Sequence, residues 1–389
     1  MIHFLFRFFE GIAILGCITS ACYYAACLWG AASFLSETKA SRKETPSTLP
    51  PFSILKPLKG TDPEMYESFR SHCLQDYPEY EIIFGVSEPD DPAVADVERL
   101  RKEFPGRVIQ LVVCPNQLGA NAKVSNLEHM VGVARYEYLV VNDSDIRVPA
   151  NYLRHLAAPL AEPSVGMVTC LYHGAAAPTL GSRLESLGIA TDFSPGVLVA
   201  RILEGGLRFG LGSTLAFRRT DLNQIGSFRS MVDFLADDYE LGKRIAALGR
   251  KVLLSDVVVE THLSAYPMRG FFAHQIRWAR GVRDSRLGGY VGLVATFGLM
   301  WSLLLVVIAH GTIWSWYTLG LVALMRFAVA LVVGRGVLQD RQLPRLLWLL
   351  PLRDLIAAAV WIVSFFGHTV TWRGDRFVLK NGRLSRVGP

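Results

Sequence analysis

The sequence predicts an α/β domain, built on a mixed, mostly parallel sheet with helices on both faces, and joined to transmembrane helices. Short apolar runs alternate with segments of helical spacing between residues 53 and 146, which is typical of such a sheet. Hydrophobic residues form 51% of the 389 residues, and the mean hydropathy of +0.29 is high for a soluble protein. The apolar run at 138–141 ends in two carboxylates, which indicates a ligand site at the edge of the sheet.

The charge balance is basic, with a net charge of +6, although only 19% of the residues are charged. In a chain with apolar spans this excess favours an anionic membrane surface or an anionic substrate. No basic and aromatic motif for base recognition stands out, so no nucleic-acid partner is expected. The six cysteines show neither Cys-x-x-Cys nor zinc-finger spacing, which predicts reduced thiols and no disulfide framework.

An almost uncharged segment at residues 11–34 is long enough to cross a bilayer core of about 30 Å. A cleavable signal peptide is the alternative. Signal peptides have a shorter apolar part than this segment and are followed by an Ala-x-Ala cleavage site, so we favour a retained anchor at residues 1–36. The basic residues that come next are Lys39, Arg42 and Lys43. They place the following domain on the cytoplasmic side. Residues 37–51 form a linker.

The catalytic domain is expected at residues 52–262. Its first strands are predicted at 53–55, 81–86, 108–113 and 138–141, with helices at 64–73, 93–104 and 123–134 between them. A further strand is predicted at 252–259. Strands that alternate with helices in this way form parallel pairs, and their carboxyl ends meet at one edge of the sheet.

The fourth strand ends in Asp143 and Asp145. Residues two apart on a strand point to the same face, so both carboxylates can reach one hard cation if the backbone stays near-extended. Such a metal, Mg²⁺ or Mn²⁺, would bridge a diphosphate and neutralise the leaving group. The alternative is an ordinary turn, in which Asp and Ser are common.

Two further acidic clusters follow the same pattern. Asp90 and Asp91 lie in a turn after the second strand and could bind a base or ribose edge. Asp238 opens a helix and could accept the proton of an attacking hydroxyl, although acids are also favoured at helix starts by the helix dipole. A glycine-rich approach to a strand, with Gly210 and Gly212, suits either a backbone that passes close to a ligand or a tight packing turn.

The segment at 266–286 mixes aromatic and basic side chains, and we assign residues 263–288 to an interfacial helix. Phe271, Phe272 and Trp278 would lie in the membrane interface. Arg277 could pair with a departing phosphate, because a guanidinium offers it a bidentate fork. An amphipathic helix packed on the soluble domain is the alternative.

A C-terminal transmembrane region is predicted at 289–370, with apolar spans near 290–309, 311–333 and 346–366. The third span contains Arg353 and Asp354, which should face protein or water, or the segment is broken. One span before the domain and three after it would place the basic tail, residues 371–389, outside. Its positive charge argues for the inside, and the sequence leaves this conflict open.

Other chemistries fit poorly. The chain has no Gly-x-x-x-x-Gly-Lys-Ser/Thr and no Gly-x-Gly-x-x-Gly after its first strand, which argues against P-loop enzymes and Rossmann dehydrogenases. It also has no His-Glu-x-x-His and no Gly-x-Ser-x-Gly, which argues against zinc and serine hydrolases.

Four short motifs follow one another along the chain: Asp90-Asp91-Pro92, Asp143-Ser144-Asp145-Ile146, Asp237-Asp238-Tyr239 and Arg277-Trp278. In this order they resemble the D, D, D, (Q/R)xxRW pattern of membrane glycosyltransferases of the ceramide glucosyltransferase group. The chain is also similar to bacterial relatives associated with hopanoid lipid biosynthesis. The resemblance covers roughly residues 50–290.

The resemblance implies a GT-A fold, a UDP-sugar donor, inversion at the sugar, a membrane lipid acceptor and a bacterial inner-membrane location. It assigns Asp143 to the metal and diphosphate site with Asp145, and Asp238 to the general base. Lys123 and Asn126 match a lysine–asparagine segment near the donor. One departure concerns His274, which stands four residues before Trp278 where the pattern has Gln or Arg.

The leading hypothesis is a metal-dependent, inverting hexosyltransferase that moves one hexose or N-acetylhexosamine to a lipid hydroxyl. A processive β-glycan synthase could use the same core, but it needs a translocation channel, and His274 departs from the glutamine that such synthases carry. A membrane protein that binds nucleotide sugars without turnover is the third possibility.

Overall fold

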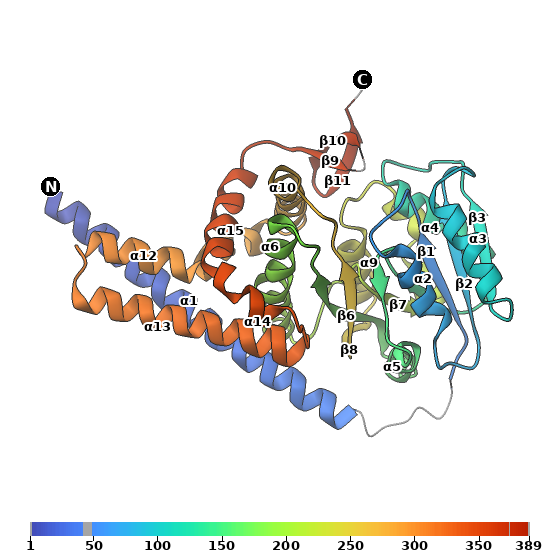
Figure 1. Cartoon of the computed structure of the whole chain (residues 1–389), viewed down its shortest axis with the longest axis horizontal. Helices are drawn as coiled ribbons and strands as arrows, with labels where there is room; N and C mark the ends of the chain where they lie inside the picture. The colour runs from blue at the N-terminus through green and yellow to red at the C-terminus, as the bar shows by residue number, and fades with distance from the viewer. Residues whose placement is uncertain (1, 42–48, 373, 388–389) are drawn as a thin grey trace.

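The computed structural model describes residues 2–41, 49–372 and 374–387. An α/β body and a group of long helices lie side by side, joined at the N-terminal end by the linker from α1 (Ile2–Ser41) (Figure 1). This helix extends five residues beyond the predicted anchor and so takes up the first part of the predicted linker. The rest of that linker at 42–48, with Arg42 and Lys43, lies outside the described residues.

The α/β body is built on an eight-stranded sheet of order β3-β2-β1-β4-β7-β6-β8-β5. Its strands are β1 (Phe52–Pro57), β2 (Tyr80–Val86), β3 (Val108–Val113), β4 (Tyr138–Val141), β5 (Ile146–Arg147), β6 (Val165–Ala175), β7 (Leu215–Arg218) and β8 (Lys251–His262). The first four strands are parallel, β7 runs antiparallel between β4 and β6, and β8 is parallel to β6. The predicted mixed, mostly parallel sheet is confirmed. Every residue of β1 and β2 is buried, which explains why these strands read as continuous apolar runs.

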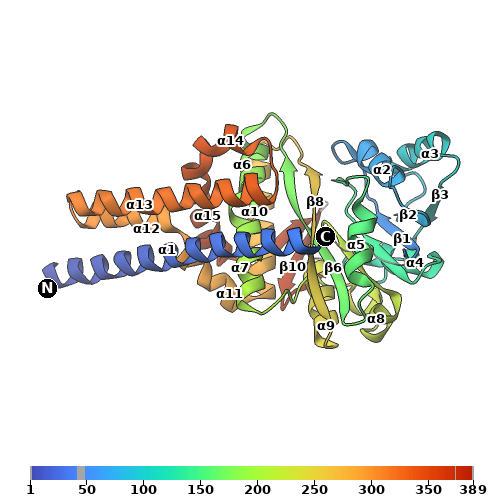
Figure 2. The ribbon, with the colours of Figure 1, turned by 90° about the horizontal axis from the view of Figure 1, so that it is seen from below.

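Helices connect the strands and cover the sheet (Figures 1 and 2). They are α2 (Met65–Cys73), α3 (Ala93–Glu103), α4 (Ala122–Val133), α5 (Tyr152–Leu160), α8 (Arg219–Gln224), η2 (Phe228–Met231) and α9 (Asp237–Ala247). The side chain of Asn121 caps α4, because its Oδ1 accepts from Val124 N at 3.1 Å. Its Nδ2 donates to Phe234 O at 2.8 Å, so the start of α4 is tied to the loop before α9.

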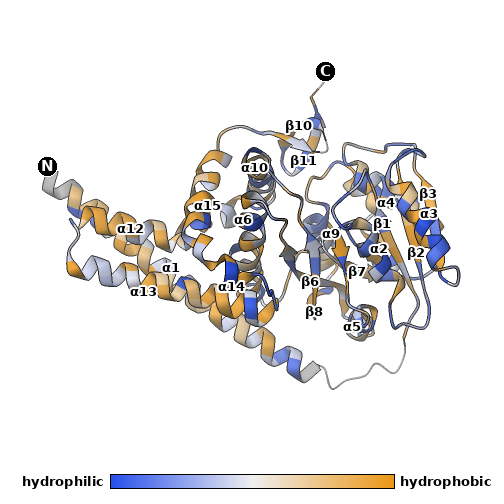
Figure 3. Cartoon of the chain, viewed as in Figure 1, coloured by the Kyte–Doolittle hydropathy of each residue, from blue (hydrophilic) through white to orange (hydrophobic). Residues whose placement is uncertain are grey.

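The remaining helices include the long hydrophobic ones of the chain (Figure 3). They are α6 (Leu180–Gly188), η1 (Ile189–Phe193), α7 (Ser194–Leu203), α10 (Met268–Ser285), α11 (Leu287–Gly292), η3 (Leu293–Thr296), α12 (Gly298–Ile308), α13 (Ile313–Val329), η4 (Ala330–Val337), α14 (Leu343–Leu346), η5 (Leu347–Leu349) and α15 (Leu350–Ser364). Helices α1, α12 and α13 lie along one another in both views (Figures 1 and 2).

Within the described residues, four helices are long and apolar enough to cross a membrane: Phe6–Lys39, Leu180–Leu203, Ile313–Val337 and Leu343–Ser364. The second was not predicted, because its small and polar residues dilute the hydropathy of the segment. The span predicted near 290–309 is instead two helices that meet at an angle of 51°. Arg353 and Asp354 lie on α15 and face protein, as the sequence required: Arg353 is buried, and Asp354 pairs with Arg326 of α13.

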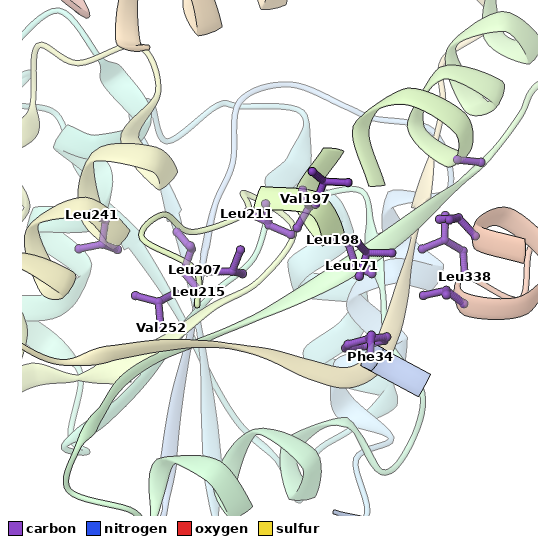
Figure 4. Close-up of a cluster of buried hydrophobic side chains, with 14 of the residues drawn as sticks. Phe34, Leu171, Val197, Leu198, Leu207, Leu211, Leu215, Leu241, Val252 and Leu338 are labelled. Atoms are coloured by element: carbon purple, nitrogen blue, oxygen red, sulfur yellow. The ribbon is translucent and has the colours of Figure 1, made fainter. Parts of the chain in front are cut away.

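The hydrophobic core of the sheet continues into these helices without a break (Figure 4). Leu171 of β6 and Leu215 of β7 belong to the same buried cluster as Phe34 of α1, Leu198 of α7 and Leu338 after η4. The catalytic body and the apolar helices are therefore packed as one unit.

The predicted basic tail folds into a second sheet of order β11-β10-β9, formed by β9 (Thr369–Trp372), β10 (Asp375–Lys380) and β11 (Arg383–Arg386). It pairs with the loop before α9, because Leu235 N donates to Gly382 O at 3.0 Å and Leu384 N donates to Asp233 O at 2.7 Å. The tail therefore lies beside the catalytic body.

Candidate active site

The predicted acidic residues gather where β4, α4 and α9 meet. After β4 the chain does not stay extended: Ile146 N donates to Asp143 O at 3.4 Å, which closes a turn. Asp143 and Asp145 are therefore not placed by the strand alternation that the sequence suggested. Lys56, at the end of β1, fixes the turn by donating from Nζ to Asp143 O at 2.9 Å. Burial lowers the pKa of Lys56 to about 7, against the opposing effect of the two aspartates.

Lys123, in the first turn of α4, joins two of the acidic clusters. Its Nζ lies 2.8 Å from Asp143 Oδ1 and 3.2 Å from Asp237 Oδ2. Burial alone would lower the pKa of Lys123, but these two carboxylates outweigh it and raise the pKa above its usual value. The ammonium group stays charged and holds the ends of β4 and α9 together.

Asp145 is held by a different strand of the sheet, because Thr261 Oγ1 on β8 donates to its Oδ2 at 2.6 Å. Burial and the charge of Asp143 raise the pKa of Asp145 to about 6. Among the described residues, no three His, Cys, Asp or Glu side chains are grouped to hold a metal ion. Two carboxylates that repel each other would nevertheless suit a Mg²⁺ or Mn²⁺ ion, which prefers oxygen ligands and would relieve the repulsion.

Asp238 lies opposite Asp143 across Gly212. A Cβ added to Gly212 would be 3.1 Å from Asp238 Oδ2 and 3.5 Å from Asp143 Oδ2. Glycine at this position therefore leaves the space between the two carboxylates open, which favours the ligand interpretation of the sequence. Gly210 fits the packing interpretation, because a Cβ there would be 2.3 Å from Leu215 Cδ2.

The environment of Asp238 suits a proton acceptor. Its Oδ1 accepts from Tyr239 N at 2.7 Å, which fixes the carboxylate at the start of α9. Burial and the neighbouring charge of Asp237 raise the pKa of Asp238 to about 6, and Lys123 opposes the rise. A base with this pKa is ionised near neutral pH and still basic enough to take a proton.

Tyr172, on β6, marks the point where the acidic groups converge. After burial, the charges of Asp238, Glu185, Asp143 and Asp145 are the causes that raise its pKa. Glu185, from α6, was not predicted. It is only 2% exposed, and its neighbours in the sequence gave no signal, because Ser182, Arg183 and Ser186 make this segment resemble an ordinary polar helix start.

Glu185 orients His274 of α10, whose Nδ1 lies 3.0 Å from Glu185 Oε1. The imidazole stacks on Tyr266, with ring centroids 5.5 Å apart, and packs at 5.0 Å against the ring of Trp278. His274 and Trp278 are thus brought together with Tyr266 in one aromatic group.

Arg277 is partly exposed on the same helix. Burial and the charge of Glu185 raise the pKa of Tyr266 to about 12. The charge of Arg277 lowers this pKa and that of Asp145 raises it. This places the guanidinium within electrostatic reach of the acidic site. The prediction that Phe271 lies in the membrane interface is wrong, because this side chain is fully buried, with its Cβ 3.0 Å from the position a Cβ would take on Gly181 of α6. Phe272 is 36% exposed.

A pocket of about 330 Å³ adjoins the acidic site at the ends of β2 and β3. It is lined by Ser87, Glu88, Pro89, Cys114, Pro115, Gln117, Ala122, Ser125 and Asn126. Asn126 Oδ1 accepts from Ser87 Oγ at 3.2 Å. Asn126, predicted to bind the UDP-sugar, therefore forms part of the pocket wall. Of the two predicted neighbours, Asp90 is exposed, whereas Asp91 accepts from Gly60 N at 2.9 Å and fixes the loop after β1.

The sequence model of glycosyl transferase family 21 matches residues 12–385 of the chain. Ceramide glucosyltransferases 3 and 1 of Caenorhabditis elegans are 25% and 23% identical to it, over 95% and 97% of this chain and 82% of each relative. The structure is similar to that of the mannosyltransferase PcManGT from Pyrobaculum calidifontis in complex with GDP-Man and Mn²⁺, with a TM-score of 0.52 and 21% identity over 92% of this chain and 99% of that one. This likeness confirms the predicted GT-A fold. The chain belongs to glycosyl transferase family 21 and is, as predicted, a glycosyltransferase.

Proposed function

We propose that the protein transfers a single hexose or N-acetylhexosamine from a UDP-sugar to a hydroxyl of a membrane lipid, of the ceramide or hopanoid type, with inversion at the sugar. The observation that carries the proposal is the open space at Gly212 between Asp238 and Asp143, in a catalytic body whose core continues into apolar helices. The family and the C. elegans relatives support the reaction class and the lipid acceptor.

In this reaction the donor nucleoside binds in the pocket beside Asn126, and its diphosphate lies over Asp143. A bound Mg²⁺ or Mn²⁺, held by Asp143 with Asp145, would supply charge neutralisation for the leaving UDP. Lys123 holds the Asp143 carboxylate in place through its 2.8 Å contact. Asp238 takes the proton of the acceptor hydroxyl as that oxygen attacks the sugar from the opposite side. Arg277 pairs with the departing phosphate.

The protein is proposed to be an integral membrane protein with a cytoplasmic catalytic body, in a bacterial inner membrane. Because the tail returns to the catalytic body, the helices between them cross the membrane an even number of times. Helices α12 and α13 lie along α1 and form a hairpin that crosses and returns (Figure 1). Helices α6, α7 and α15 then lie at the membrane surface, where the acceptor hydroxyl reaches the site.

The test is UDP release by the purified full chain in lipid nanodiscs, with UDP-glucose or UDP-N-acetylglucosamine, with and without ceramide, followed by mass spectrometry of the lipids. Lipid-dependent UDP release and a product with one added sugar are expected. Asp238→Asn should lower both by roughly 10²–10⁴-fold, whereas Glu240→Gln, in the same first turn of α9, should leave them near the wild-type level. A polymeric product would identify a processive synthase, and UDP-sugar binding without release would identify an inactive binding protein.

A further inference from the structure

A second pocket lies where α14 packs beside the start of α6; Figure 2 shows these two helices next to each other. Its volume is about 420 Å³. Its walls are Ala176, Ala177, Pro178, Arg183, Gln342, Arg345, Leu346 and Trp348. Gln342 closes one side, because its Oε1 accepts from Ala176 N at 3.2 Å. The proposed transfer reaction uses none of these residues.

The pocket is positively charged and has no internal counter-charge. Arg183 and Arg345 are both exposed, and in the described parts of the chain no carboxylate lies within 4 Å of either guanidinium. The pocket also lies at the N-terminal end of α6, where the helix dipole adds to the positive potential. Two guanidinium groups that converge on one cavity are a binding arrangement for a phosphate group.

The rim of the same pocket is apolar and faces outward. Trp348 is 72% exposed, and Leu352 and Leu355, one and two turns further along, are 42% and 47% exposed. Large exposed apolar side chains next to arginines are typical of a helix in the membrane interface, with the ring at headgroup level and the guanidinium groups at the lipid phosphates. A soluble anion would need the arginines but not this apolar rim.

We propose that this pocket binds the headgroup phosphate of an anionic membrane phospholipid, with its acyl chains along Trp348, Leu352 and Leu355. The inference rests on the proposed position of α15 at the membrane surface, since α14 and η5 lead directly into α15. A neutral acceptor lipid gives the two arginines no counter-charge, so the ligand is distinct from the proposed acceptor. Each arginine near an anionic surface strengthens such binding roughly fivefold, so the pair should enrich the lipid about 25-fold at most.

The test uses the full chain in nanodiscs with equal mole fractions of phosphatidylglycerol and phosphatidylcholine. After extraction, native mass spectrometry gives the ratio of the two lipids that remain bound. The wild type should retain mainly phosphatidylglycerol, and Arg183→Gln/Arg345→Gln should lose most of this preference. The matched control is Arg335→Gln/Arg341→Gln, which removes two exposed arginines of the same region that do not line the pocket and should keep the preference.

Three results would overturn the proposal: no preference in the wild type, an equal loss in both double variants, or displacement of the lipid by inorganic phosphate together with no effect of Trp348→Ala. The last would identify a site for a soluble phosphate. Thermal unfolding of each variant shows whether it is folded. UDP release is measured on the same samples, so a failed lipid preference with intact transfer would refute this site and leave the proposed function standing.

Discussion

Replacement of Lys123 tests how the two acidic clusters are held together. At an effective dielectric constant of 20, its contacts of 2.8 and 3.2 Å with Asp143 and Asp237 correspond to about 6 and 5 kcal/mol of Coulomb energy before desolvation is subtracted. Breaking a buried pair costs roughly 3–5 kcal/mol and breaking an exposed pair roughly 0–1. The side chains of Lys123 and Asp237 are 18% and 10% exposed but that of Asp143 is 41% exposed, so we expect Lys123→Gln to destabilise the protein by about 2–3 kcal/mol.

The same substitution should also change the pH dependence of activity. Asp238 has a pKa of about 6 and must be ionised to act as a base, so kcat/KM should fall as the pH drops through about 6. Lys123 lowers that pKa, so its removal should raise it, and the acid limb should move to higher pH. Lys123→Arg keeps the charge and is the matched control.

The assay is the pH profile of kcat/KM for UDP release with lipid acceptor, measured for the wild type and both variants, with thermal unfolding of the same samples. An acid limb at the same pH in Lys123→Gln and Lys123→Arg would refute the electrostatic coupling between α4 and Asp238. An unchanged unfolding temperature in Lys123→Gln would show that the lysine does not hold the two elements together.

Four further outcomes follow from the site. Asp238→Asn should lower kcat by roughly 10²–10⁴-fold with donor KM nearly unchanged, and a change in KM alone would exclude it as the base. EDTA should abolish transfer and Mg²⁺ or Mn²⁺ restore it, while Asp143→Asn should lose metal-dependent UDP binding measured by calorimetry; full activity in excess EDTA would contradict this. Glu185→Gln should lower kcat while the chain stays folded, because His274 loses its orienting charge, and activity equal to wild type would make the pair structural. Trp278→Ala should impair transfer to lipid far more than slow donor hydrolysis, and equal losses would assign it to the fold.

The parallel half of the sheet was predictable from the sequence because its strands read as short apolar runs, and β1 and β2 at its centre are buried over their whole length. The acidic residues were predictable as a group because parallel strands end at one edge. Their detailed placement was not, since the turn closed by Ile146 N and Asp143 O depends on Lys56 from another strand. Whether Gly210 or Gly212 lies beside the carboxylates of Asp143 and Asp238 likewise depends on the packing of α9.

Contacts between distant segments account for the rest. Glu185 and His274 meet only because α6 packs against α10, and no local pattern joins them. Phe271 was assigned to the membrane because helical periodicity shows that one face is apolar but not what covers it. The small C-terminal sheet escaped prediction because its strands are short and rich in basic residues, and because its pairing partner is a loop far away in the sequence.

The C-terminal sheet has a consequence for biogenesis. The loop that leads into Asp237 and Asp238 is bonded to Gly382 and Leu384, which follow the apolar helices in the chain. The catalytic body is synthesised before those helices, yet this loop lacks its partner strand until the segment beyond them has also been made. A nascent chain therefore has its acids without the strand that positions them. Assembly of the catalytic loop is in this way coupled to synthesis of the apolar helices that separate it from its partner.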